Sequence, residues 1–174
     1  IMATLVHMIP ILMDAGLPRT NATWIAGIMG FAAMGGVLLA GALADRLPGH
    51  FVYAGFIAVL AITWPIHLIK SDSVMLKLFA CVVQGVVGGA QSHLLPYLTT
   101  RYFGLRAFGK IYGTVASLLA VGVGTGPVLA GYIYDQTHSY NLLLMIGSPV
   151  AIVSALMLLT LGRYPQDLGH PKNA

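Results

Sequence analysis

Of the 174 residues, 57% are hydrophobic and only 8% are charged, against about 25% charged residues in an ordinary soluble domain. The formal net charge is +4, but the basic residues stand singly beside apolar runs, which argues against a nucleic-acid partner. The one cysteine, Cys81, lies inside an apolar run, so neither a disulfide framework nor a cysteine metal site is available.

Six apolar runs divide the chain, and about 20 apolar residues suffice to cross the roughly 30 Å hydrocarbon core of a bilayer. The first run, 1–13, covers only about 20 Å at 1.5 Å per residue, and we interpret it as the remainder of a helix cut by the start of the sequence. Five complete spans are expected at 24–43, 51–69, 76–98, 111–133 and 141–161. The sequence therefore predicts an all-α polytopic membrane protein of six transmembrane helices, followed by a polar tail at 165–174.

The basic residues divide unevenly between the two sides of the membrane if successive spans alternate in direction. One side carries Arg46, Arg101, Arg106, Lys110, Arg163 and Lys172, whereas the other carries only Arg19, Lys70 and Lys77. The positive-inside rule places the first side, and with it the C-terminal tail, in the cytoplasm. We expect the protein in the plasma (inner) membrane, with the missing N-terminal connection also cytoplasmic.

Glycines recur inside the predicted spans at a spacing of four residues, which places both members of a pair on one helix face. The pairs are Gly85 with Gly89, Gly109 with Gly113, and Gly122 with Gly126. Such residues let helix backbones approach closely in lipid, so we expect them at helix–helix contacts. Gly126 next to Pro127 also predicts a hinge, which favours a transporter, although a static packed bundle remains an alternative.

A family resemblance emerges from four segments. Residues 41–50, GALADRLPGH, resemble the Gly-x-x-x-Asp-Arg loop motif of the major facilitator superfamily, and the segments RYFG (101–104), FGKIYG (108–113) and GPVLAGYIYD (126–135) are similar to the region around its tenth and eleventh helices. The resemblance implies that residues 1–164 are helices seven to twelve, the first truncated, of a twelve-helix secondary transporter. The stretch 103–113 also looks like bacterial relatives of monocarboxylate and oxalate/formate carriers, which implies an organic anion as solute.

The loop motif carries a further implication for the cytoplasmic surface. In the family its aspartate helps to hold the two halves together, so Gly41, Asp45 and Arg46 would form a latch against the absent half. The loop departs from the family pattern, because Pro48 adds a position and His50 follows where basic residues are usual. The alternative is that Asp45 and Arg46 only mark the membrane surface.

Polar residues within the cavity-lining helices of the family are the candidate site residues, since polar groups are costly inside a membrane. His7 and Asp14 lie seven residues apart on the first span and hence on roughly one face. We expect them to couple a proton, because histidine exchanges protons near neutral pH, and His7 also to contact the solute. The alternatives are a neutral histidine bonded to a neighbouring helix and an interfacial aspartate at a helix end.

Two glutamines repeat the seven-residue spacing on the span at 76–98. The amides of Gln84 and Gln91 can bond a polar solute without the desolvation cost of a charge, or can pair helices instead. Met29, Tyr112 and Ser117 complete the predicted solute-binding set, although a serine hydroxyl can also bond to its own helix.

Several functions find no support in the sequence. No nucleophile with its base, metal triad or phosphate-binding loop is present, so we expect neither an enzyme nor a cofactor. No Lys or Arg lies at the centre of a complete span, so a fixed cation for a carboxylate would come from the unseen half. The expected partners are the bilayer, a missing N-terminal half and a small-molecule substrate. The alternative is a self-contained six-helix protein acting as a homo-oligomeric scaffold or half-size carrier.

Overall fold

The computed structural model describes residues 1–69 and 73–162, and all regular secondary structure in this part of the chain is helical. The helices are α1 (Met2–Val6), α2 (Met8–Asp14), α3 (Arg19–Ala44), α4 (Gly49–Leu68), α5 (Val74–Phe103), α6 (Phe108–Thr137) and α7 (Asn141–Leu159). The five from α3 to α7 are long and apolar enough to cross a membrane, which confirms an all-helical protein with membrane-spanning helices. The predicted tail 165–174, with Lys70, Arg163 and Lys172, lies outside the described residues.

The first apolar segment differs from the single helix predicted for residues 1–13. It forms two short helices, α1 and α2, that meet at His7. Pro10 explains the break, because proline has no N–H to donate to the carbonyl of Val6 and its ring crowds that carbonyl. The His7 N–H still bonds to the Ala3 carbonyl at 3.2 Å, so the last turn of α1 remains hydrogen-bonded.

A glycine turn ends α2 and reverses the chain into α3. Gly16 has φ of 104°, a conformation that L side chains rarely adopt. The N–H of Leu17 bonds to the Leu12 carbonyl and that of Gly16 to the Met13 carbonyl, both at 3.0 Å, which is the Schellman pattern of helix ends. Leu17 is buried, so the turn is anchored in the apolar interior.

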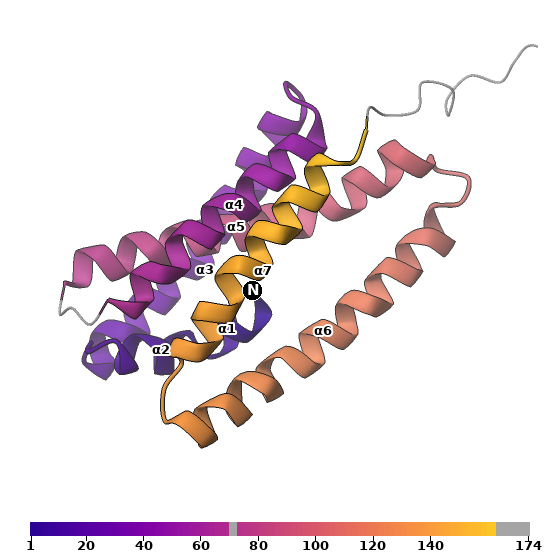
Figure 1. The fold of residues 1–174 in the computed structure, drawn as a ribbon. Coiled ribbons are helices and arrows are strands. Elements are labelled where there is room, and N and C mark those ends of the chain that lie inside the picture. The colour runs from indigo at the N-terminus through magenta and orange to yellow at the C-terminus, as the bar shows by residue number, and fades with distance from the viewer. Residues whose placement is uncertain (70–72, 163–174) are drawn as a thin grey trace, which may run out of the picture.

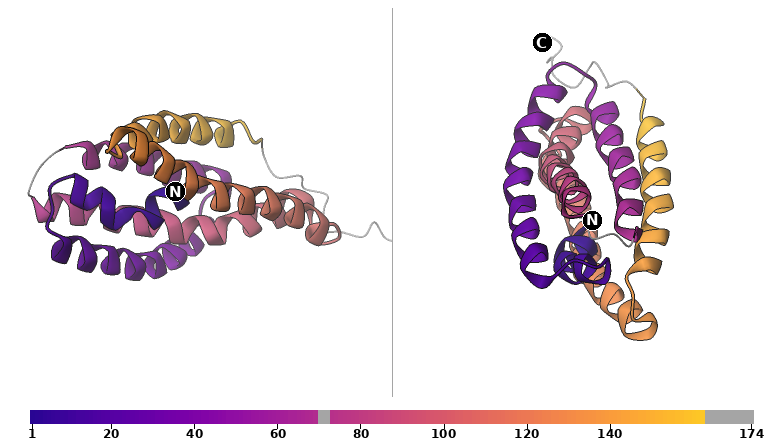
Figure 2. Two further views of the ribbon diagram at one scale, coloured as in Figure 1. Left: turned by 90° about the horizontal axis from the view of Figure 1, so that it is seen from below. Right: turned by 90° about the vertical axis from the view of Figure 1, so that its left-hand side faces the viewer.

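The long helices are packed unequally. α5 lies between α3 and α4, and α7 covers the outer side of α4 (Figure 2). α1 and α2 fill the space between α3 and α6, whereas α6 runs along the edge of the bundle (Figure 1). Ala130 is the one buried residue of α6, all of which is described. Most of the surface of α6 is therefore left without a helix partner in this chain.

The two ends of the bundle differ in charge among the described residues. The end that holds the α3–α4 and α5–α6 connections, here called the basic end, carries exposed Arg46, Arg101, Arg106 and Lys110 beside the single acid Asp45. Lys77 lies towards the opposite end but is buried, and its Nζ donates to the carbonyls of Ile66, His67 and Ile69 at 3.1, 3.3 and 2.6 Å. Lys77 therefore caps the carboxyl end of α4, and the basic end holds the larger exposed positive charge.

Candidate functional site

The α3–α5 interface, here called the glycine seam, brings two backbones into contact. A Cβ atom on Gly85 would overlap the Met29 carbonyl, and one on Gly89 would overlap the Ala33 carbonyl. Gly36 on α3 faces the Val86 carbonyl of α5 in the same way. Only glycine fits at these three positions, so the two backbones stay in contact along about two turns of α3.

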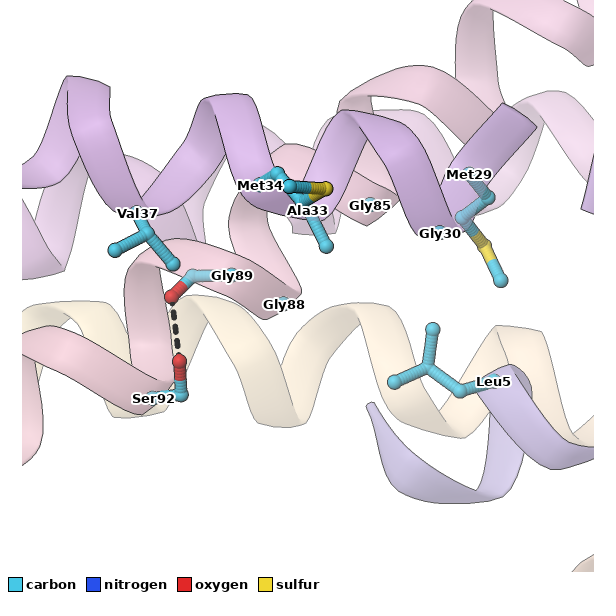
Figure 3. A pocket seen from close by; sticks show the side chains of 10 residues that line it. All are labelled: Leu5, Met29, Gly30, Ala33, Met34, Val37, Gly85, Gly88, Gly89 and Ser92. Atoms are coloured by element: carbon cyan, nitrogen blue, oxygen red, sulfur yellow. Dashed lines mark hydrogen bonds between the residues drawn. The ribbon is translucent and has the colours of Figure 1, made fainter. Parts of the chain in front are cut away.

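An apolar recess of about 430 Å³ opens beside the glycine seam (Figure 3). Met29, Met34 and Val37 of α3 and Leu5 of α1 form its walls. The one hydroxyl in the lining, on Ser92, donates to the Gly89 carbonyl at 2.7 Å. The recess therefore offers a solute mainly apolar contact, to which the predicted residue Met29 contributes.

A second cavity, here called the α5–α6 cavity, measures about 340 Å³ and adjoins the recess through Gly88 and Ser92. It brings together three predicted residues, Gln91 of α5 with Tyr112 and Gly122 of α6, and Ile1 and Met2 close one side. The Gln91 side chain also lies close to Tyr53 of α4, which sequence spacing gave no reason to select. An amide and a phenol therefore face one space, where both can bond to a polar solute.

Gln84 has a different environment although it lies on the same face of α5. It is fully buried, and its Nε2 donates to the Thr4 hydroxyl of α1 at 2.7 Å, while Thr4 donates to the Ile1 carbonyl at 2.7 Å. Its Oε1 has no partner among the described residues. Gln84 thus links α5 to α1. This is the arrangement expected if its amide pairs two helices, the alternative to binding a solute.

The remaining predicted residues of α6 lie away from the α5–α6 cavity. Ser117 is exposed, and its hydroxyl donates to the Gly113 carbonyl at 2.8 Å. A Cβ on Gly126 would make only an ordinary contact, at 3.6 Å, with Ala3, and α6 runs uninterrupted through Pro127. Gly126 is therefore not crowded by a neighbouring backbone.

The two residues predicted to couple a proton both face the α6–α7 connection, but at separate points. His7 is half-buried, its Nδ1 lies 3.3 Å from the Ala3 carbonyl, and its ring centroid is 5.6 Å from that of Tyr140. Its Nε2 points towards α6 at Gly131. Asp14 Oδ2 accepts from the Ser139 hydroxyl at 2.8 Å and from the Tyr140 N–H at 3.0 Å. Asp14 therefore ties the end of α2 to the start of α7.

Aromatic rings surround this tie. Tyr134 stacks on Tyr140 with centroids 4.7 Å apart, and both line a hollow of about 460 Å³ together with Asp14. Burial raises the pKa of Tyr140, and the nearby Tyr134, Asp14 and Asp135 raise it further. These tyrosines and Ser139 were not among the predicted site residues, because they lie at or beside a connection, where helical spacing gives no signal.

The predicted latch residues lie at the basic end. Asp45 and Arg46 are exposed just after α3, and Gly41 is half-buried in its last turn. Beside them the Tyr97 hydroxyl donates to the Ala44 carbonyl at 3.2 Å, and Arg101 Nε donates to that hydroxyl at 3.2 Å. These bonds fasten α5 to the end of α3 and leave the loop motif at the surface.

No group of three or more metal-ligating side chains occurs within residues 1–69 and 73–162. The polar side chains around the α5–α6 cavity are amide, hydroxyl and phenol groups. This chemistry suits the binding and passage of a solute, and it supplies no nucleophile paired with a base.

Comparison with known proteins gives matches that cover the chain. The family model described as Major Facilitator Superfamily matches residues 1–174. The uncharacterized transporter YycB of Bacillus subtilis (strain 168) is 26% identical over 166 residues, or 93% of this chain and 39% of that protein. Monocarboxylate transporters 12 and 9 of Rattus norvegicus are 25% and 26% identical over 157 and 141 residues, which is 88% and 78% of this chain but 32% and 27% of those proteins. No solved structure matches the chain.

Proposed function

This chain belongs to the Major Facilitator Superfamily, a family of membrane transporters and not of enzymes, and we propose that it forms the C-terminal half of a secondary carrier for a small organic anion. In such carriers two halves rock about a site near the bilayer midplane. The chain spans less than two fifths of the length of the relatives it matches, so the activity proposed is that of the longer protein.

The surface of α6 supports a missing half. Its residues are almost all unburied, and a Cβ on Gly109, Gly113 or Gly124, which lie on one side of the helix, would meet nothing within 4 Å. Small residues on a bare helix face suit the close approach of another helix. On this proposal that helix comes from the N-terminal half, and Gly41, Asp45 and Arg46 latch the two halves on the cytoplasmic side.

The α5–α6 cavity supports the solute class. Gln91 and Tyr112 can donate to carboxylate oxygens, and two of the relatives are named monocarboxylate transporters. Lys77 is committed to three backbone carbonyls, so the balancing cation would come from outside this chain.

His7 is our candidate for carrying a coupling proton. Its Nδ1 is within reach of the Ala3 carbonyl, which leaves Nε2 as the acceptor facing α6. Asp14 already accepts two hydrogen bonds. We therefore assign it the structural role of holding the end of α2 against the start of α7, and not the transfer of a proton. Protonation at His7 would change the charge at the α1–α2 break, where the chain is already interrupted.

Uptake of labelled monocarboxylates by the complete protein in proteoliposomes, driven by a proton gradient, tests the proposal. Gln91→Ala should raise the half-saturating concentration about tenfold or more, since a hydrogen bond to a charged group contributes about 1.5–3 kcal/mol. Ser117→Ala is the matched control, because its hydroxyl bonds to its own helix. Absence of uptake for every carboxylate, or an equal effect of both variants, would contradict the assignment.

A further inference from the structure

A groove on the face formed by α4 and α7 has no role in the proposed transport site. It measures about 450 Å³ and lies between the two helices at the surface of the bundle. Its floor is made of small residues, Gly55 and Ala58 of α4, and its rims are the exposed side chains of Phe51, Ile62, Leu156 and Leu159. Apolar rims and a floor of small residues give the methylene groups of a linear chain a surface to pack on.

The length of the groove along α4 matches the thickness of one leaflet of a bilayer. From Phe51 to Ile62 α4 rises about 17 Å at 1.5 Å per residue, and half of a hydrocarbon core is about 15 Å. α4 begins at the basic end, so the groove extends from that surface to about the midplane. The other end of the α4–α7 interface is closed, because a Cβ on Gly147 would overlap the Trp64 ring.

The charge at the end of the bundle where the groove opens selects among lipids. Arg46 is exposed in the short connection that leads into α4, next to the acid Asp45, and this end as a whole carries four exposed basic side chains against that one acid among the described residues. Basic residues beside a membrane surface attract anionic phospholipids of the cytoplasmic leaflet. A zwitterionic lipid would gain the same apolar contact without this attraction.

We propose that the α4–α7 groove binds one acyl chain of an anionic phospholipid of the cytoplasmic leaflet, with the headgroup at the basic end. The site depends on the membrane orientation given under the proposed function but on no step of transport. It lies on α4 and α7, away from the α5–α6 cavity, so the lipid is a bound partner and not the transported solute.

Native mass spectrometry of the complete protein tests the site, after incubation with equal amounts of phosphatidylglycerol and phosphatidylcholine that carry the same acyl chains. Wild-type protein should retain phosphatidylglycerol several-fold over phosphatidylcholine. Gly55→Leu should lower the retained lipid about tenfold, since a leucine side chain displaces methylene groups from the groove. A Cβ on Gly55 meets nothing within 4 Å, so the variant fills the groove without disturbing the helix packing.

Two further variants complete the experiment. Ala58→Leu fills the groove from the next turn and should repeat the loss, and Val153→Phe adds bulk to exposed α7 surface outside the groove and should change nothing. Unchanged lipid retention in both groove variants, or equal retention of the two lipids, would overturn the proposal. A wild-type dimer that Gly55→Leu dissociates would also overturn it, by assigning the groove to a second copy of the chain. The readout is lipid mass, so a negative result is separable from a failure of transport.

Discussion

Two helices of this protein carry glycine pairs at the same four-residue spacing in opposite surroundings. On α5, Cβ atoms at Gly85 and Gly89 would overlap main-chain carbonyls of α3, whereas at Gly109 and Gly113 of α6 they would meet nothing within 4 Å. The spacing therefore identifies a face that another helix can approach, but it does not say whether the approaching helix belongs to the same chain. The glycine seam is complete within this chain, whereas the α6 face is open here and, on our proposal, receives a helix of the N-terminal half.

The largest effect is expected where the seam is tightest. Gly89→Ala forces a methyl group against the Ala33 carbonyl, and because both groups sit on helix backbones neither can turn aside. Overpacking of this kind costs about 3 kcal/mol. Unfolding of the protein by SDS titration measures the loss.

The neighbouring glycine provides the matched control for the seam. A Cβ on Gly88 would lie 3.9 Å from Leu5, an ordinary contact, so Gly88→Ala should change the free energy of unfolding by less than about 0.5 kcal/mol. Equal losses in the two variants would mean that glycine itself, and not the close approach to α3, determines stability at this level of α5.

A smaller effect is expected at the hydrogen bonds by which Asp14 ties the end of α2 to the start of α7. Asp14→Ala removes the acceptor for the Ser139 hydroxyl and the Tyr140 N–H, which should cost about 1–2 kcal/mol. Asp14→Asn keeps one acceptor oxygen and should recover part of the loss. If Asp14→Ala were as stable as the wild type in the same titration, the α6–α7 connection would be held by its ring contacts alone.

The same connection predicts a pH dependence with a definite sign. The pKa of Tyr140 is raised by burial and by its anionic neighbours, so the folded state favours the neutral phenol. Its contribution to stability is complete below the unfolded tyrosine pKa of about 10 and is lost as the pH rises through the higher folded value. Unfolding measured from pH 9 to 11 should show this decline in the wild type.

Tyr140→Phe should flatten that decline, because phenylalanine has no proton to lose. Tyr132→Phe is the control, since Tyr132 is 64% exposed on α6 and should leave the pH profile as it is. An unchanged slope in Tyr140→Phe would show that other groups cause the alkaline loss of stability.

The sequence predicts the long helices well because each is one uninterrupted apolar run, and length and composition alone fix that outcome. It misses the break at His7, where Pro10 removes a single hydrogen bond inside a run that remains apolar. It also treats Lys77 as a charge that flanks a span. The local sequence does not indicate that the carboxyl end of α4 lies within reach of the Lys77 Nζ. Hydropathy describes how a segment meets lipid, and not which backbone groups lie opposite a side chain.

The two glutamines of α5 illustrate the same limit at the candidate site. Gln84 and Gln91 share a helix face, and spacing gives them the same role. In the fold Thr4 stands opposite Gln84 and accepts its N–H, whereas Gln91 meets Tyr53 and opens on the α5–α6 cavity. The difference arises from the level at which α1 crosses α5, which is a tertiary property. Polar residues on one face are therefore candidates until the opposing helix is known.

The smallest effect is expected on the α6 face, and it separates the two glycine patterns most sharply. Gly113→Leu adds a side chain where nothing lies within 4 Å, so SDS unfolding of the chain of residues 1–174 should change by less than about 0.5 kcal/mol. In the complete carrier the same side chain would stand between α6 and the helix that we propose approaches it, and transport should fall. A loss in the chain itself as large as that of Gly89→Ala would contradict the comparison, because α6 would then have its partner within this half. An unaffected carrier would show instead that α6 faces lipid, for which an added leucine is harmless.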